Sequence, residues 1–162
     1  MCFPPLLFFA HLAQGRKVYL EACENYQKRS LRNRYYIAGA NKVEMLSIPL
    51  EGGKNNQCPI KQVRISRAEP WHEIHLRNIQ AAYGKSAFFH FYIEELTEIY
   101  ESNEELLWDF NRKCIQFCVQ KLQLSHMPQA SRKYNSNFRG ADYREAEISD
   151  FYVETRHLYS SI

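Results

Sequence analysis

The chain has 162 residues, a formal net charge of +3 at pH 7 and an aromatic content of 14%. This length fits one domain that buries about 70% of its unfolded surface without a disulfide or metal staple. The aromatic content argues against disorder, and the mild charge argues against a nucleic-acid binder, which would carry a stronger, continuous basic stripe.

The first half of the sequence predicts one helix and several short strands. Leu6–Ala13 follows two prolines, which suit the first turn of a helix, and Gln14-Gly15 ends it. β-type residues then recur in short runs, and Pro49 indicates an edge strand or a strand end. The predicted strands are Lys17–Leu20, Arg34–Ile37, Val43–Leu50 and a further run around Val63 and Ile65.

The second half changes to helical spacing after Pro70. Apolar residues recur at three- and four-residue intervals in three stretches, and Gly84 closes the first of them. The predicted helices are Trp71–Tyr83, Tyr92–Tyr100 and Leu106–Leu124. We therefore expect an α+β (mixed α/β) fold, in which a small sheet from the N-terminal half is packed by helices from the C-terminal half.

A single domain is expected over the whole chain. Its predicted parts are a core over residues 1–124, a Ser-, Asn-, Gln- and Arg-rich loop over 125–141, and a C-terminal segment over 142–162 with a short strand at its end. No stretch approaches the roughly 20 apolar residues that span a bilayer. The apolar N-terminus has no Lys or Arg before it and is interrupted by Pro4-Pro5, which disfavours a signal peptide and favours a cytoplasmic protein.

The five cysteines are odd in number and lack Cys-x-x-Cys spacing, which disfavours a disulfide framework or a zinc cage. Reduced thiols are the simplest interpretation. Cys114 and Cys118 lie four residues apart on a predicted helix, where they either ligate a group or pack in the core, and core packing is the commoner role.

The segment from Tyr26 to Tyr36 is the strongest candidate for a working surface. It holds four cations, Lys28, Arg29, Arg32 and Arg34, between polar and aromatic residues. Guanidinium groups grip phosphate or carboxylate in a bidentate manner, and a lysine adds a mobile point charge. The residue types alone are also compatible with an ordinary solvated basic loop.

Two further sets of residues carry possible chemistry. His72 and His75 lie three apart on a predicted helix, where they suit a metal, a general acid or base, or a structural role. Asp142 and Arg144 stand two apart, on one side of any extended segment. Neither a Gly-x-Gly-x-x-Gly motif, a P-loop nor a Gly-x-Ser-x-Gly elbow is present, so no cofactor is expected.

Several stretches together resemble the WbqC-like protein family. They are Phe3-Pro4-Pro5 through Phe9-Ala10, Val18–Glu21, Asn25–Lys28, Arg32–Tyr35, Ile37–Asn41, Leu46–Pro49, and Trp71 with His75, Arg77, Ile79 and Tyr83. The resemblance covers roughly residues 3–125, and Asp142-x-Arg144 is a further match. The family usually has a strand before the Phe-Pro turn and a longer C-terminal end, so by this comparison the chain is truncated at both ends. Leu76 stands where the family tends to have an aromatic residue.

The family is bacterial and is often encoded among genes for surface polysaccharide assembly, and some relatives are described as glycine transferases. The resemblance therefore implies a cytoplasmic transferase, glycine- or sugar-modifying, for an O-antigen type of polysaccharide. Its substrate would be an anionic activated sugar or amino-acid precursor. The predicted catalytic residues are His75, Lys28 and Asp142. The predicted substrate-binding residues are Tyr26, Arg32, Asn33, Arg34, Asn41, Arg77 and Arg144.

Two alternatives remain open at this stage. In the first alternative, the chain is a non-catalytic binding or assembly protein of a polysaccharide biosynthesis machine, and exposed Tyr and Phe residues form its interface. A nucleotidyltransferase-like domain is the third hypothesis, although His11 is the one histidine in the opening helix and such sites use two.

Overall fold

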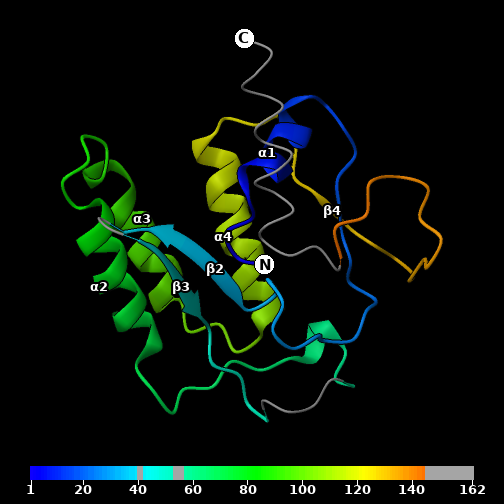
Figure 1. The fold of residues 1–162 in the computed structure, drawn as a ribbon, viewed down its shortest axis with the longest axis horizontal. Coiled ribbons are helices and arrows are strands. Elements are labelled where there is room, and N and C mark those ends of the chain that lie inside the picture. Colours follow the sequence, from blue (N-terminus) through cyan, green and yellow to red (C-terminus); the bar gives the residue numbers. More distant parts are fainter. Residues whose placement is uncertain (40–41, 53–56, 145–162) are drawn as a thin grey trace.

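The structure is a computed structural model that describes residues 1–39, 42–52 and 57–144. Within these ranges the chain is an α+β protein, as the sequence predicts (Figure 1). Its elements are α1 (Leu6–Ala13), β1 (Tyr19–Leu20), β2 (Arg34–Ala38), β3 (Val43–Ser47), the 3-10 helix η1 (Ile60–Gln62), α2 (Trp71–Tyr83), α3 (His90–Glu101), α4 (Leu107–Lys121) and β4 (Gln129–Ala130).

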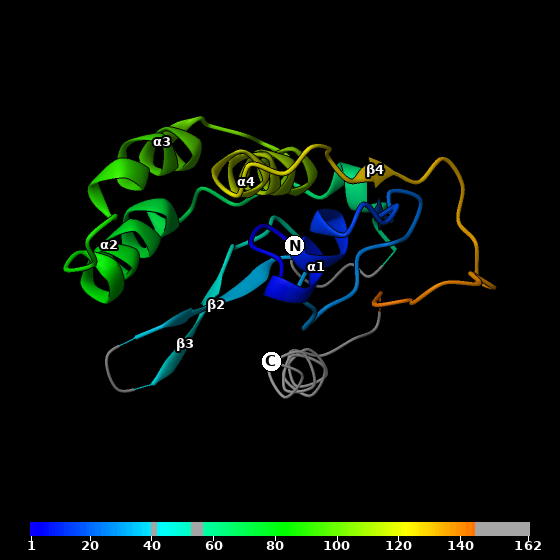
Figure 2. The same ribbon diagram turned by 90° about the horizontal axis from the view of Figure 1, so that it is seen from above.

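Strands β2 and β3 form an antiparallel hairpin that lies against helices. Tyr35 pairs with Leu46, and both side chains are buried together with Ile37. Viewed from above, α2, α3 and α4 lie on one side of this hairpin (Figure 2). The alternation of buried and partly exposed residues along β2 therefore follows the period of two that a one-sided sheet requires. The predicted sheet of the N-terminal half is confirmed.

The run around Val63 and Ile65 was predicted as a strand, but it does not form one. Arg64 makes an isolated bridge with Leu106, and Ile65 makes another with Leu50. Because each residue pairs with a different segment, no continuous ladder develops. Predicted β-character was correct here, but the partners that a strand needs are divided between two parts of the chain.

The three C-terminal helices follow their predicted positions closely. Helix α2 begins directly after Pro70 and ends before Gly84. Helix α4 ends at Lys121, three residues before the predicted end, since Gln123 adopts a left-handed φ of 53° that stops the helix. Aromatic rings join these helices: the Trp71 ring lies 5.3 Å from that of Phe110 and 5.9 Å from that of Tyr100.

Helix α4 connects two hydrophobic clusters. Phe110 and Cys114 belong to the large core beneath the hairpin, whereas Ile115 and Val119 pack against Leu12 and other residues of α1. The partly buried Cys118 packs against this second cluster, and burial raises the pKa of its thiol to about 12. These positions agree with a core-packing role for Cys114 and Cys118.

The short strand β4 lies within the segment 125–141, which was predicted as a loop. It pairs in parallel with β1, in the register Tyr19 to Gln129 and Leu20 to Ala130. Two residues are too few to show a period in the sequence. The pairing also depends on a partner strand about 110 residues away, which no local pattern reveals. The pairing brings the residues around 21 next to those around 131, which builds one wall of the site described below.

Within residues 1–39, 42–52 and 57–144, no helix combines the length and the apolar character that crossing a bilayer requires. The strand predicted within Phe151–Ile162 lies outside the described residues.

Candidate functional site

A cavity of about 550 Å³ lies between α1, β1, the start of α4 and the segment 131–144. This volume is in the range of pockets that hold small molecules. Ten charged residues of the described chain line it. Seven are cations and three are carboxylates: Arg16, Lys17, Arg32, Arg112, Arg132, Lys133 and Arg144, with Glu21, Glu24 and Asp142.

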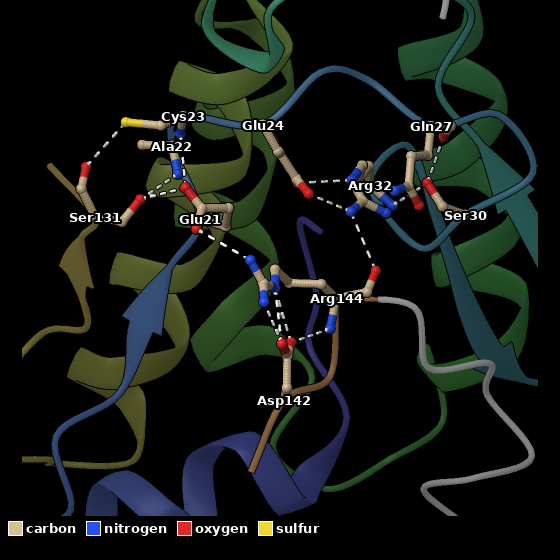
Figure 3. A network of polar contacts seen from close by, with 10 residues as sticks. All are labelled: Glu21, Ala22, Cys23, Glu24, Gln27, Ser30, Arg32, Ser131, Asp142 and Arg144. Atoms are coloured by element: carbon tan, nitrogen blue, oxygen red, sulfur yellow. Dashed lines mark hydrogen bonds and ion pairs between the residues drawn. The ribbon is translucent and has the colours of Figure 1, made fainter. Parts of the chain in front are cut away.

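The loop that follows β1 supplies a buried ion pair to this cavity. Arg32 donates from Nε to one oxygen of Glu24 at 2.7 Å and from Nη2 to the other at 2.5 Å, and both side chains are only 10% exposed. Nη2 also donates to the backbone oxygen of Arg144 at 3.1 Å (Figure 3). Arg32 therefore ties its own loop to the C-terminal segment, and within the described residues its Nη1 makes no hydrogen bond.

A second cluster surrounds Arg144, which lies next to the Arg32–Glu24 pair (Figure 3). Its guanidinium bonds both oxygens of Asp142, with Nε at 2.9 Å from each, and Nη1 lies 3.7 Å from Glu21. Glu21 also accepts from the hydroxyl of Ser131, next to the β1–β4 pair. The hydrogen bond with Arg144 lowers the pKa of Asp142, and the same bond raises the pKa of Arg144.

The net charge of the cavity follows from these pairs. Glu24 forms an ion pair with Arg32, whereas Glu21 and Asp142 both form ion pairs with Arg144. The other five cations have no carboxylate partner within the described chain: Arg16, Lys17, Arg112, Arg132 and Lys133. The wall of the cavity consequently carries a surplus of four positive charges, which favours an anionic ligand.

Tyr26 and Asn33 stabilise the loop from which Arg32 projects. The Tyr26 hydroxyl donates to Oδ1 of Asn33 at 2.9 Å, and Nδ2 of Asn33 donates to the backbone oxygen of Ile48 at 2.9 Å. Both side chains are buried, and burial raises the pKa of Tyr26. They lie beside the cavity wall, where they fix the loop to the end of β3.

Asn111 is a buried polar residue of α4 that the sequence interpretation missed. Its Nδ2 donates to the backbone oxygen of Arg32 at 2.9 Å, whereas its Oδ1 is buried without a hydrogen-bond partner. Leaving a buried acceptor unpaired costs about 1–3 kcal/mol. The signal in the sequence was an amide four residues from both Leu107 and Ile115, on the apolar face of a predicted helix.

His75 occupies the core instead of this cavity. It is 3% exposed, and its Nδ1 lies 3.0 Å from the hydroxyl of Tyr35, which in turn lies 2.5 Å from that of Tyr100. Burial lowers the pKa of His75 to about 4, against the opposing effect of a backbone hydrogen bond with Ser47. The ring is therefore neutral at pH 7 and hydrogen-bonded among aromatic residues.

The other predicted site residues lie elsewhere. Lys28 and Arg77 are exposed, and Arg34 is partly buried in β2 with its Nε unpaired; none of the three lines the cavity. Asn41 lies outside the described residues. The structure thus brings Arg32, Asp142 and Arg144 together, places Tyr26 and Asn33 beside them, and leaves His75, Lys28, Arg34 and Arg77 apart from them.

The sequence model of the WbqC-like protein family matches residues 1–157, nearly the whole chain. The chain belongs to the WbqC-like protein family. The matched region includes every residue of the charged cavity wall. Neither the curated proteins nor the solved structures contain a match to this WbqC-like chain.

Proposed function

We propose that this WbqC-like chain is a transferase-like protein of the bacterial cytoplasm that binds an anionic activated sugar or amino-acid precursor. The precursor would serve surface polysaccharide biosynthesis of the O-antigen type. The single observation that carries the proposal is the cation surplus of the 550 Å³ cavity, in which all three carboxylates are already paired. A phosphate or carboxylate entering there meets cations without displacing an existing partner.

The two ion-pair clusters have different parts in this proposal. Arg32 is held rigidly by Glu24 and lines the cavity, so it contributes a fixed anchor. Arg144 and Asp142 belong to the segment after β4 and complete the wall beside Arg32. Arg112, Arg132 and Lys133 are exposed at the cavity and supply mobile charge for the anionic group.

The proton-transfer role of His75 and the catalytic role of Lys28 stay predictions. His75 is enclosed by Tyr35, Trp71 and Tyr100, which is the environment of a structural histidine. Lys28 is exposed on the loop outside the cavity. A substitution of either residue that abolished turnover without loss of stability would support a catalytic role.

Thermal unfolding in the presence of candidate ligands tests the proposal. The panel comprises phosphate, pyrophosphate, nucleotide sugars and free amino acids. A ligand at a hundredfold excess over its Kd stabilises the fold by about 2.7 kcal/mol, which raises Tm by about 5–10 °C in a chain of this size. We expect a shift for anionic precursors that Arg112→Ala reduces and Lys85→Ala, an exposed substitution away from the cavity, leaves intact.

The class that shifts Tm is then mixed with acceptor sugars, and release of its phosphate-bearing leaving group is measured. If the leaving group is released only when the protein is present, the result supports a transferase. If no anionic compound shifts Tm at millimolar concentration, the proposal is wrong.

An exposed aromatic pair favours a second candidate, the non-catalytic assembly protein. Phe88 and Phe91 are 65% and 72% exposed at the start of α3, and their rings lie 6.4 Å apart. Large exposed apolar side chains that cluster are typical of interaction surfaces. This function would be favoured if a polysaccharide-assembly protein bound the wild type but not the variants Phe88→Ser and Phe91→Ser. The wild type should then also show no response to the ligand panel.

A further inference from the structure

The orientation of the Asn111 amide is fixed by its surroundings. Nδ2 donates to the backbone oxygen of Arg32, so the reversed orientation would place two oxygens against each other. The free end of the amide is therefore the oxygen Oδ1. Asn111 lines the cavity, is 94% buried and has no partner for this oxygen within the described chain.

A lone buried acceptor is satisfied by an ordered water or by a ligand donor, and the donors that the two precursor types offer are a hydroxyl and an amine. The surplus of four cations on the same wall disfavours an ammonium group, because the like charges repel it in a site that is partly shielded from water. A neutral hydroxyl carries no such penalty. The electrostatics of the cavity thus discriminate between the two precursor types named above.

We propose that Oδ1 of Asn111 accepts a hydrogen bond from a sugar hydroxyl, so the cavity takes a sugar phosphate with its anionic group at Arg112, Arg132 and Lys133. This inference rests on the proposed anionic ligand and narrows it to one class. Asn111 belongs to α4, which both hydrophobic clusters hold in place, and Oδ1 exposes less than 1 Å² of its surface, so a hydroxyl reaches it only when the side chains that cover it move aside. The specificity for the sugar comes from Asn111, and the affinity for the phosphate comes from the cations.

The test compares two kinds of probe by calorimetry. Inorganic phosphate reports on the cations alone. The 1-phosphates of glucose, galactose, mannose and N-acetylglucosamine add hydroxyls, and aminomethylphosphonate adds an amine. For the wild type we expect at least one sugar phosphate to bind about five- to tenfold more tightly than phosphate, the worth of one hydrogen bond in a built site.

Asn111→Leu keeps the size of the side chain and removes the acceptor Oδ1 together with the Nδ2 donor to the backbone oxygen of Arg32, so its phosphate affinity also reports whether Arg32 stays in place. We expect this variant to bind phosphate within about twofold of the wild type and to lose the preference for the sugar phosphate. A merely structural role of Asn111 would weaken both probes equally and would overturn the inference. A preference that survives in the folded variant, or the absence of any preference in the wild type, would also overturn it.

A second measurement needs no variant, in case Asn111→Leu does not fold. The affinity of the wild type is measured for each monodeoxy form of the preferred sugar phosphate. One of these forms must bind more weakly by about the same five- to tenfold factor. Tighter binding of aminomethylphosphonate than of every sugar phosphate would contradict the hydroxyl. If inorganic phosphate itself fails to bind, the anionic site is wrong. If phosphate binds and Arg132→Ala weakens it while no sugar phosphate is preferred, only the present inference fails.

Discussion

Glu24 and Arg32 form a bidentate ion pair that is nine-tenths buried, within the loop after β1 that forms part of the cavity wall. Arg32 was predicted as a clamp for an anion, and the structure gives its guanidinium a carboxylate of the same chain. The loop, α4 and the C-terminal segment all meet at Arg32, through its bonds with Glu24, Asn111 and Arg144. Arg32 is therefore an organising residue of the site.

Glu24→Gln should destabilise the chain strongly, because it leaves the Arg32 guanidinium buried without a countercharge. Removing one partner of a buried pair typically costs 3–5 kcal/mol, and we expect about 3 kcal/mol here. Urea unfolding measures this free energy. Glu105→Gln is the matched control: Glu105 bonds Arg64 at 2.8 Å, but the two side chains are 66% and 51% exposed. The control should cost less than about 1 kcal/mol. Equal effects of the two substitutions would mean that the Glu24 pair is not buried in solution.

Tyr35→Phe should destabilise the core by about 1–3 kcal/mol. The substitution removes one hydroxyl and leaves Nδ1 of His75 and the hydroxyl of Tyr100 without their shared partner. Tyr36→Phe on the same strand is the control, since the side chain of Tyr36 points to the other face and is only partly buried. Thermal and urea unfolding should separate the two variants. A Tyr35→Phe chain as stable as Tyr36→Phe would contradict the buried network.

The stability of the chain should fall with pH below about 6.5 because of His75. Its pKa is lowered from 6.5 to about 4 in the folded state, so the unfolded state takes up the proton first. The contribution of this ring is complete above pH 6.5 and is lost as the pH falls toward 4, with a total of roughly 3 kcal/mol. His75→Gln should flatten this part of the profile of unfolding free energy against pH. A profile for His75→Gln identical with that of the wild type would refute the burial of the ring.

Local signals in the sequence predicted the helices and the hairpin because their causes are local. Pro70 and Gly84 bound α2, and the alternation of Tyr35 and Ile37 with their neighbours marks β2. The parallel pairing of β1 with β4 escaped prediction, since it joins two-residue strands about 110 residues apart.

The same distinction applies to the candidate site. Arg32, Asp142 and Arg144 stood out by residue type, and the structure brings them together. His75 stood out equally, yet it packs in the aromatic core, and its spacing of four residues from both Trp71 and Ile79 on the apolar face of α2 was the signal for this position. Asn111 was missed because its significance depends on the backbone of Arg32, 79 residues earlier in the chain.

The central claim is that the charged cavity, and not the exposed basic loop, binds an anion. Calorimetric titration of pyrophosphate into the wild type, Arg132→Ala with Lys133→Ala, and Lys28→Ala tests it most directly. We predict that the double variant binds about tenfold or more weakly, that added salt reduces the difference, and that Lys28→Ala binds as the wild type does. A loss confined to Lys28→Ala, or no binding of pyrophosphate by the wild type, would contradict the account.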